Sequence, residues 1–520
     1  MVLCVGPFKI LWDIMGSIGV PLSFVNAVRS MYVGVVCQVK VEGCAGPEFP
    51  SCIGVKQGCP LSPTLFGIFI DRMCFRISSR AGHLGPRLSC GTRVPLVLYA
   101  DDFALISMGS SASQGMHALL ALVDEHNAAT GMRANTSVGK TELVIFGVSS
   151  ARRSQLQLET FYVGGQAISH VPEYKYLGIM HHESRHWGAD LELRHAKAQR
   201  SLGAMHGNLV ALEATKSVAL AFRMHDVCVR TVQTYGSGVW ATSYNAVSPA
   251  QVARNLLESG HLQFMRRWCR LRQNVPVWAI YAELGRLPLH YYWWREVVRL
   301  WNSIVALPEG SVWHEILRDN LIDQHCRRKN WAGQVLAFLR AIGHVAGHGS
   351  LELAPLDVDQ VLRLLLQRYG CVWESLPKFP RLASSQVHLA TYYNWVFRGE
   401  WLDRPAYLFL NLSYRQTYTF VGFKLGCHRL PIETGRWDGT PRLQRICQRC
   451  EQGALDDERH LVFECPAFEH LRVANRPLFG QEVGFDMRRF FAHADQRAVV
   501  MYILDCLRLI GLYASVGDGS

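Results

Sequence analysis

Two adjacent carboxylates interrupt an apolar segment of the chain. Asp101 and Asp102 lie within Leu96–Ile106, where the residues on both sides of the pair are apolar. Such a segment predicts buried strands, yet aspartate is disfavoured inside strands, and a carboxylate in apolar surroundings is costly unless it is paired. We therefore predict a tight hairpin that presents both carboxylates at its tip to a hard cation such as Mg²⁺. The alternative is an Asp-Asp turn with no chemical role, which is the commoner meaning of a bare pair.

A second group of four residues, near the C-terminal end of the chain, has the types and spacing of a metal site. They are Cys447, Cys450, His460 and Cys465, in the pattern Cys-x2-Cys-x9-His-x4-Cys. Three thiolates and one imidazole suit a closed tetrahedral zinc site, so we predict that these four residues bind Zn²⁺. The alternative is a set of buried free cysteines. Because no basic segment precedes an apolar run at the N-terminus, we see no signal peptide and expect a reducing compartment, where close cysteines favour metal over disulfides.

Two further segments have features of a nucleic-acid site. Gly58, Pro60 and the Ser62-Pro63 pair predict a rigid loop that enters a helix, where a phosphate or a base pair could lie. The alternative is an ordinary capped loop. Residues 251–300 hold eight arginines, three acidic residues and eight aromatic residues. Four of these arginines flank Trp268, and we expect them to contact phosphates: Arg266, Arg267, Arg270 and Arg272. The alternative for this segment is a helical aromatic core with a solvated arginine face.

Composition is compatible with these sites and narrows the class of protein. The chain has 520 residues, of which 49% are hydrophobic and 18% charged, and this excludes a disordered chain. Its 16 cysteines are too few for a disulfide-stapled scaffold. The net charge of +12 favours an anionic partner. No segment reaches the roughly 18 consecutive apolar residues of a membrane-spanning helix; the best candidate, Ala498–Leu512, predicts an amphipathic helix.

The elements that would position these residues alternate irregularly. Strands are predicted at Val35–Val41 and within Leu96–Ile106, and helices at Leu61–Ser78 and Gln114–Thr130. From about residue 185 the pattern is helical. Loops are expected at residues 346–350 and 376–380, and frayed ends at 515–520. Taken together, these predicted strands and helices indicate an α+β protein.

Two motifs together resemble a known family. QGCPLSP at residues 57–63, followed by YADD at residues 99–102, is similar to the reverse transcriptases of non-LTR (LINE-type) retrotransposons. Segments resembling further motifs of that family are Gly131–Glu142, Tyr174–Gly178, Tyr235–Trp240 and Ala282–Trp293. The resemblance implies a partial palm at 1–184, an antiparallel sheet with helices. It also implies a helical thumb at 185–345, a helical connection at 346–435, and a zinc-knuckle region with a C-terminal helix at 436–520.

The resemblance also implies roles for single residues. Asp101 and Asp102 would hold Mg²⁺ or Mn²⁺, and Lys140 would act as a general acid on pyrophosphate, with a solvated surface lysine as the alternative. The substrates would contact Gln57, Gly58, Pro60, Tyr99, Tyr176, Leu177 and Gly178. The implied partners are an RNA template, a DNA primer and deoxynucleoside triphosphates, in the nucleus or cytoplasm and without a membrane.

One motif of the family is missing. Its first catalytic aspartate belongs to a segment of the type FxDxxxAFD, and residues 1–50 contain none. We therefore expect a chain that lacks the fingers and the first half of the palm, with little or no polymerase activity alone. The alternative function is a non-catalytic, zinc-containing nucleic-acid-binding protein derived from such an element.

Overall fold

A computed structural model describes residues 8–51, 54–56, 58–211, 217–245, 254–325, 330–344, 353–375, 392, 396, 405–479 and 487–513. The chain divides into two compact units. Unit 1 comprises Met1–Asp190 with Pro308–Asp319, and unit 2 comprises Leu191–Leu307 with Asn320–Ser520. Gln57 and the loops expected at 346–350, 376–380 and 515–520 lie outside the described residues. Among the helices that are described, none is both long and apolar enough to cross a membrane.

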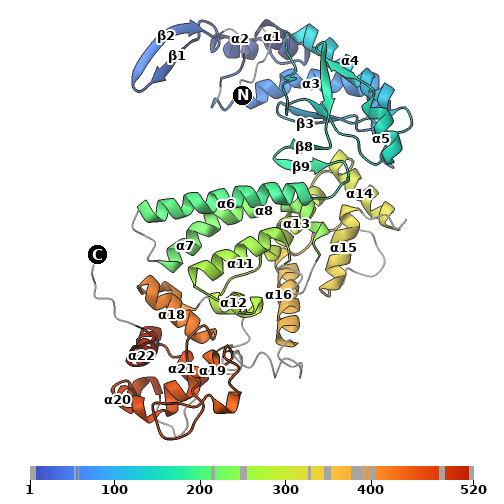
Figure 1. Cartoon of the computed structure of the whole chain (residues 1–520). Helices are drawn as coiled ribbons and strands as arrows, with labels where there is room; N and C mark the ends of the chain where they lie inside the picture. Colours follow the sequence, from blue (N-terminus) through green and yellow to red (C-terminus); the bar gives the residue numbers. More distant parts are fainter. Residues whose placement is uncertain are drawn as a thin grey trace. The chain divides into compact units, whose positions relative to one another are not determined.

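Unit 1 mixes helices with short strands (Figure 1). Its helices are α1 (Phe8–Ser17), α2 (Leu22–Ser30), α3 (Ser62–Ala81), α4 (Ala112–Thr130) and α5 (Ser150–Gln157). Its strands are β1 (Val36–Val41), β2 (Cys44–Pro50), β3 (Leu96–Tyr99), β4 (Asp102–Leu105), β5 (Glu142–Leu143), β6 (Phe161–Val163), β7 (Gln166–His170), β8 (Glu173–Tyr176) and β9 (Ile179–His182). The strand and helix predictions for this unit are confirmed, with ends that differ by a few residues.

The strands that the structure describes form four small sheets and not one continuous sheet. β1 pairs with β2, β3 with β4 and β8 with β9, each as an antiparallel hairpin. The fourth sheet has the order β5-β7-β6, in which β5 and β7 are parallel. The α+β class is therefore confirmed, although the sheet structure is more divided than the resemblance implied.

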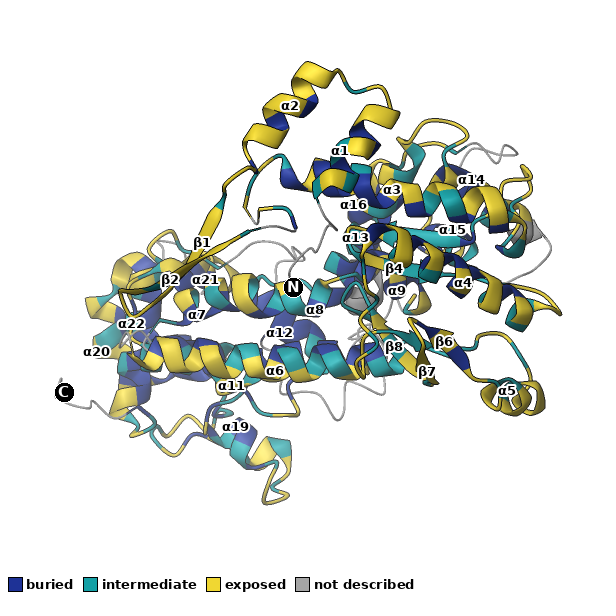
Figure 2. Ribbon diagram, turned by 90° about the horizontal axis from the view of Figure 1, so that it is seen from above, coloured by how far each residue is buried: buried dark blue, intermediate teal, exposed yellow. Residues whose placement is uncertain are grey.

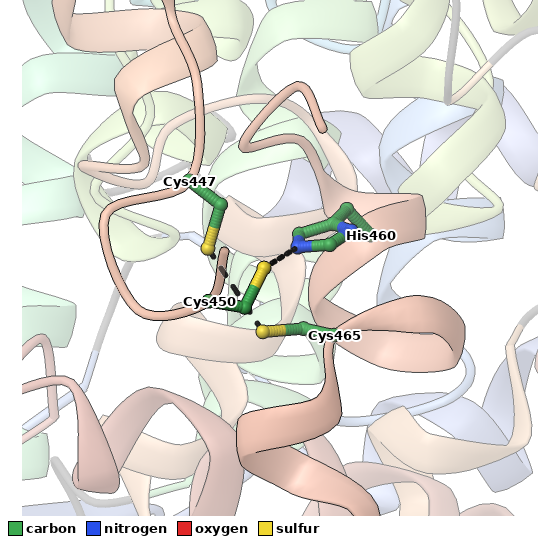
Figure 3. Close-up of side chains that lie close together, drawn as sticks. All are labelled: Cys447, Cys450, His460 and Cys465. Atoms are coloured by element: carbon green, nitrogen blue, oxygen red, sulfur yellow. Dashed lines mark hydrogen bonds between the residues drawn. The ribbon is translucent and has the colours of Figure 1, made fainter. Parts of the chain in front are cut away.

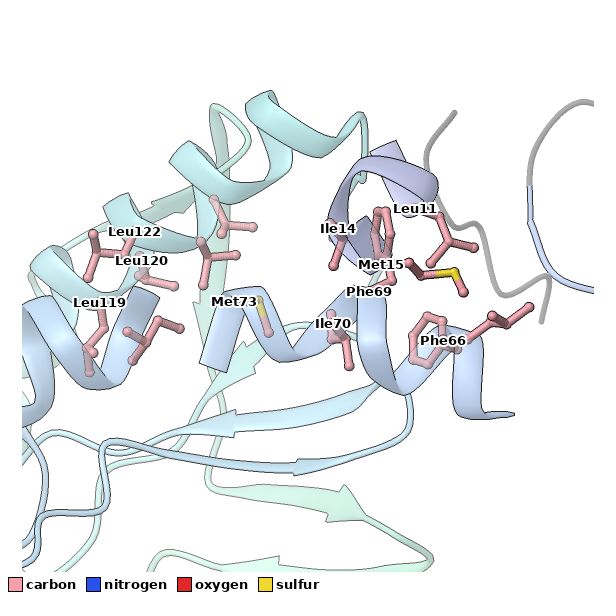
Figure 4. Close-up of a cluster of buried hydrophobic side chains, with 14 of the residues drawn as sticks. Leu11, Ile14, Met15, Phe66, Phe69, Ile70, Met73, Leu119, Leu120 and Leu122 are labelled. Carbon is pink, nitrogen blue, oxygen red and sulfur yellow. The ribbon is translucent and has the colours of Figure 1, made fainter. Parts of the chain in front are cut away.

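The core of unit 1 is built around α3 (Figure 4). The buried side chains of this helix recur at the three- and four-residue spacing of one helical face. They pack with Leu11, Ile14 and Met15 of α1, and with Leu119 and Leu120 of α4. Leu96, Leu98, Phe103 and Leu105 of the β3–β4 hairpin lie against the same core. The apolar residues on both sides of the two aspartates therefore anchor the hairpin.

Unit 2 is helical, as predicted from residue 185 onward. Its helices are α6 (Gly188–Ala211, beginning in unit 1), α7 (Val218–Met224), α8 (Arg230–Thr234), α9 (Ser237–Trp240), α11 (Leu256–Trp268), α12 (Val277–Leu284), α13 (Leu289–Val305), α14 (Val312–His325, also beginning in unit 1), α15 (Trp331–Ala341), α16 (Val358–Ser375), α18 (Tyr414–Lys424), α19 (Pro431–Thr434), α20 (Glu469–Ala474), α21 (Met487–Phe491) and α22 (Gln496–Leu509). The predicted C-terminal amphipathic helix corresponds to α22.

Aromatic side chains form much of the core of unit 2. Trp293 and Trp294 on α13 are buried, and the ring of Trp294 stacks on Phe338 at a centroid distance of 3.4 Å. Trp293 packs edge-on against the buried Trp240 of α9. In Figure 2, α6 carries many exposed residues. Along α13 only Arg299 and Ser303 are exposed. Of the two interpretations of the aromatic residues in 251–300, the helical core applies to these tryptophans.

Candidate active site and metal centre

The β3–β4 hairpin presents the two carboxylates at its turn. Tyr99 pairs with Asp102, which leaves Ala100 and Asp101 as a two-residue connection. Ala100 has a φ of +52°, a left-handed conformation that costs a non-glycine residue energy. Strain of this kind collects at functional sites. Asp102 is exposed and Asp101 is partly exposed, as the tight hairpin predicted from the sequence requires.

The β8–β9 hairpin has an equally tight turn. Tyr176 pairs with Ile179, so that Leu177 and Gly178 form the connection. Both have positive φ, +46° and +80°, the combination found in a type I′ turn. Glycine adopts it freely, whereas leucine does so only when its surroundings enforce it. The three residues expected to hold the primer thus share one rigid turn.

The two hairpins meet at Asp102. The Tyr176 hydroxyl donates a hydrogen bond to the main-chain carbonyl oxygen of Asp102 across 3.4 Å. Burial raises the pKa of Tyr174 and of Tyr176, and the negative charge of Asp102 raises both further. The Tyr174 hydroxyl donates to the carbonyl oxygen of Lys140, whose own side chain is exposed. The structure therefore gathers Asp102, the β8–β9 hairpin and the main chain at Lys140.

The carboxylate pair suits Mg²⁺ in part. Mg²⁺ is commonly held by one or two carboxylates together with substrate phosphates and water. Asp101 and Asp102 supply two carboxylates at an accessible turn. Across the residues that the structure describes, no third carboxylate, imidazole or thiol groups with them. The donor set thus accounts for two protein ligands and leaves the rest of the coordination shell to substrate, to water or to further protein groups.

The loop before α3 has the rigid form predicted for it. Gly58 has a φ of +83°, and Pro60 is exposed. The Ser62 hydroxyl donates to the Lys56 carbonyl oxygen at 2.6 Å and fixes the loop at the start of the helix. The main-chain N–H of Leu61 lowers the pKa of the Cys59 thiol, and Ser62 and Lys56 lower it further. A loop end that favours negative charge is suited to phosphate.

The four predicted zinc ligands come together in unit 2 (Figure 3). Their sulfur and nitrogen atoms all lie within 4.8 Å of one another. Cys447 Sγ is 3.9 Å from Cys465 Sγ, and Cys450 Sγ is 3.4 Å from His460 Nε2. Tetrahedral bonds of about 2.3 Å to sulfur and 2.0 Å to nitrogen place such atoms roughly 3.5–3.8 Å apart. The donor set and its spacing therefore fit a zinc ion.

Groups around this Cys₃His cluster support a cation there. The main-chain N–H of Arg449 donates to Cys447 Sγ at 3.4 Å, which stabilises a thiolate. Burial and the neighbouring thiols raise the pKa of Cys465 to about 11. Burial lowers the pKa of His460, which keeps the imidazole neutral and able to ligate. A bound cation would offset the repulsion between the thiolates. Nearby, Arg449 pairs with the buried Asp456.

The four predicted nucleic-acid arginines have two different settings. Arg266 donates to the Val275 carbonyl oxygen at 2.7 Å and Arg272 to that of His428 at 3.1 Å, so both serve internal structure. Arg267 and Arg270 are exposed, although the Arg270 side chain also donates to the Tyr418 hydroxyl at 3.3 Å. Tyr174 was predicted to belong to a family motif but was given no role, although its alternation with Tyr176 along a strand places both on one face. Sequence reasoning missed Trp437, whose contact with Arg272 joins residues far apart in the sequence.

Comparison with known proteins supports the resemblance over unit 1. Residues 7–181 match the family described as reverse transcriptase (RNA-dependent DNA polymerase). The Pol polyprotein of the type-2 retrotransposable element R2DM of Drosophila melanogaster is 30% identical over 173 residues, 32% of this chain and 16% of that protein. The Pol polyprotein of the type-1 element R2 of Nasonia vitripennis is 26% identical over 167 residues, 31% of this chain and 15% of that protein.

The matched segment contains both tight hairpins and the loop before α3. The chain spans only a small part of the length of these curated relatives. Residues 7–181 therefore match the reverse transcriptase family, and over this segment the chain is similar to the Pol polyproteins of two R2 retrotransposable elements.

Proposed function

We propose that this chain contributes part of the active site of an RNA-directed DNA polymerase of a non-LTR retrotransposon. Its substrates are an RNA template, a DNA primer and deoxynucleoside triphosphates. One observation carries the proposal: Asp101 and Asp102 occupy the turn of a hairpin whose main chain accepts a hydrogen bond from Tyr176 of the adjoining hairpin. Carboxylates for a divalent cation thus lie beside the turn that would hold the primer.

The residues of this site have distinct roles in the proposal. Asp101 and Asp102 hold Mg²⁺ or Mn²⁺, which, when bound, activates the primer hydroxyl and stabilises the charge of the leaving pyrophosphate. The turn at Leu177 and Gly178 holds the primer end close to Asp102, because Tyr176 ties the two hairpins together. Lys140 is exposed and offers an ammonium group for the pyrophosphate. In this proposal Gly58, Pro60 and Tyr99 contact template and nucleotide, and so does Gln57, which lies outside the described residues.

We also propose that the chain alone polymerises poorly. No FxDxxxAFD segment precedes Asp101 in the sequence, and the described residues add no third carboxylate to the pair. Two carboxylates bind a divalent cation more weakly than three and fix the distance between two cations less well.

Cation binding and catalysis can be tested separately on the purified chain. When the chain is titrated with Tb³⁺, luminescence sensitised by Tyr99 and Tyr176 beside the carboxylates should appear. The luminescence should be weaker in the variant in which Asp101 and Asp102 are both changed to Asn. The matched control is Asp13→Asn, an exposed carboxylate on α1. Equal signals from the wild type and the double variant would contradict the cation site. Primer extension on an RNA template with Mg²⁺ should be at background in the same preparation, and extension abolished by Asp101→Ala would overturn the second proposal.

The Cys₃His cluster and the exposed arginines support the second candidate function, which is zinc-dependent binding of nucleic acid without catalysis. We propose that Cys447, Cys450, His460 and Cys465 hold a structural Zn²⁺ ion, because four donors close a tetrahedral site and leave no open position. We propose that Arg267 and Arg270 contact phosphates. Changing both to Gln should weaken RNA binding and lower the slope of log affinity against log salt by about 2. An unchanged slope would remove them from the interface.

A further inference from the structure

Arg272 joins the turn after α11 to the C-terminal part of unit 2. One guanidinium nitrogen donates to the carbonyl oxygens of Cys427 and His428, at 3.3 and 3.1 Å. The guanidinium also lies 4.4 Å from the centroid of the Trp437 ring. Trp437 nevertheless remains 58% exposed. The indole is therefore held by a cation on one face and presents its remaining surface to solvent.

A second arginine–aromatic pair stands on the same turn. Arg270 lies 4.5 Å from the ring centroid of Tyr418 on α18, and its side chain donates to the Tyr418 hydroxyl at 3.3 Å. Arg270 has a φ of +48°, a conformation that non-glycine residues rarely adopt. The strained turn thus places Arg270 against the ring of Tyr418, and Arg272, two residues later, against the ring of Trp437.

Positive charge is concentrated in the two segments that form this surface. Residues 266–272 and 425–450 together contain nine arginines and two acidic residues, a net charge of +7 out of +12 for the whole chain. Within the described residues, two of the nine pair with a carboxylate, Arg436 with Glu433 and Arg449 with Asp456. The other seven have no such ion pair there, and they include Arg267, Arg270, Arg429 and Arg442. Such a concentration of positive charge marks a surface for a polyanion.

We propose that Trp437 is a stacking platform for an unpaired base of single-stranded nucleic acid, with the surrounding arginines on the phosphates. The inference rests on the proposed nucleic-acid binding and adds to it a preference for single strands. In a duplex both faces of each base are covered by neighbours, whereas an unstacked base can lie on an indole. Leu443 and Ile446 are also exposed nearby in the sequence, which would suit a protein partner, but the net charge of +7 favours the polyanion.

The test measures binding without nucleotides or Mg²⁺, so that it does not depend on polymerase activity. A fluorescent 20-nucleotide oligouridylate and a 20-base-pair RNA duplex are titrated with the full chain. Trp437→Leu, which keeps an apolar side chain but removes the ring, should weaken single-strand binding about tenfold, the size of one lost base stack, and leave duplex binding within about twofold. Trp437→Phe should restore most of the single-strand affinity.

Trp313→Leu is the matched control, because Trp313 on α14 is 52% exposed and none of the arginines that the structure describes stacks on its ring. This variant should bind both probes like the wild type. Equal affinities for Trp437→Leu and Trp313→Leu would overturn the inference while leaving the proposed function intact. Equal loss on single strand and duplex, or loss in Trp437→Phe as large as in Trp437→Leu, would also overturn it. A wild-type chain that binds neither probe would refute nucleic-acid binding by this surface altogether.

Discussion

Removing one zinc ligand should destabilise the C-terminal part of unit 2 by an amount that the structure allows us to work out. Cys465 is fully buried and Cys447 almost so. Serine in place of Cys465 keeps the size of the side chain but is a poor zinc ligand. An ion held by both cysteines closes a loop of 18 residues. A cross-link over such a loop lowers the entropy of the unfolded chain, which raises the free energy of unfolding by about 3 kcal/mol. The buried serine hydroxyl adds about 1–3 kcal/mol if it is unpaired.

Cys506→Ser separates these two contributions. Cys506 on α22 is also fully buried but is not part of the Cys₃His cluster. Its replacement should cost only the hydroxyl contribution, so Cys465→Ser should be less stable than Cys506→Ser by about 3 kcal/mol. Urea unfolding followed by near-ultraviolet circular dichroism measures this difference, and elemental analysis measures the bound zinc.

Chelation provides the second half of this test. Treating the wild type with a zinc chelator should lower its stability toward that of Cys465→Ser, and the variant itself should not respond. The reasoning would be refuted if Cys465→Ser and Cys506→Ser unfolded at the same urea concentration and chelation left the wild type unchanged. In that case the four side chains would be a packed cluster of free thiols around a histidine.

Three further changes test individual parts of the fold. Ala100→Gly should stabilise unit 1 by about 0.5–1 kcal/mol in urea unfolding, because glycine relieves the left-handed strain; a loss would show that the turn is not strained. Lys424→Met should destabilise unit 2 by about 3–5 kcal/mol, because it leaves the buried Glu283, 2.5 Å from the Lys424 ammonium, without its cation; adding Glu283→Gln should restore part of the loss. Burial and nearby arginines lower the pKa of His126 to about 4. In the unfolded chain His126 takes up a proton near pH 6.5, and in the folded chain only near pH 4. The free energy of unfolding should therefore fall by up to about 3 kcal/mol as the pH is lowered from 6.5 to 4. His126→Phe should reduce that fall, and an unchanged pH profile would contradict it.

The features that sequence reasoning predicted well depend on neighbours along the chain. The hairpin at Asp101 follows from apolar residues on both sides of a polar pair, and the turn is closed by residues within that same segment. The four residues of the Cys₃His cluster lie within one short segment, so their spacing was enough to predict that they come together. Helices α3 and α4 follow from the spacing of their apolar residues. In each case the deciding contacts are local.

The features that sequence reasoning did not predict depend on distant contacts. Arg272 lies 155 residues from Cys427, whose carbonyl oxygen it binds, and no local pattern distinguishes it from the exposed Arg270. The link between Tyr176 and Asp102 spans 74 residues. Trp294 and Trp437 have the same side chain, yet one lies in the core and the other is exposed. Only the packing of distant helices separates these roles.

The central claim is that the two hairpins of residues 7–181 form part of a polymerase active site. A chimaera of the Drosophila melanogaster R2DM protein that carries residues 58–181 of this chain in place of its matching segment tests it most directly. We predict Mg²⁺-dependent extension of a DNA primer on an RNA template by the chimaera, and none when Asp101 and Asp102 are both changed to Ala. A folded chimaera that binds the primed template but does not extend it, or extension that survives the double change, would contradict the claim.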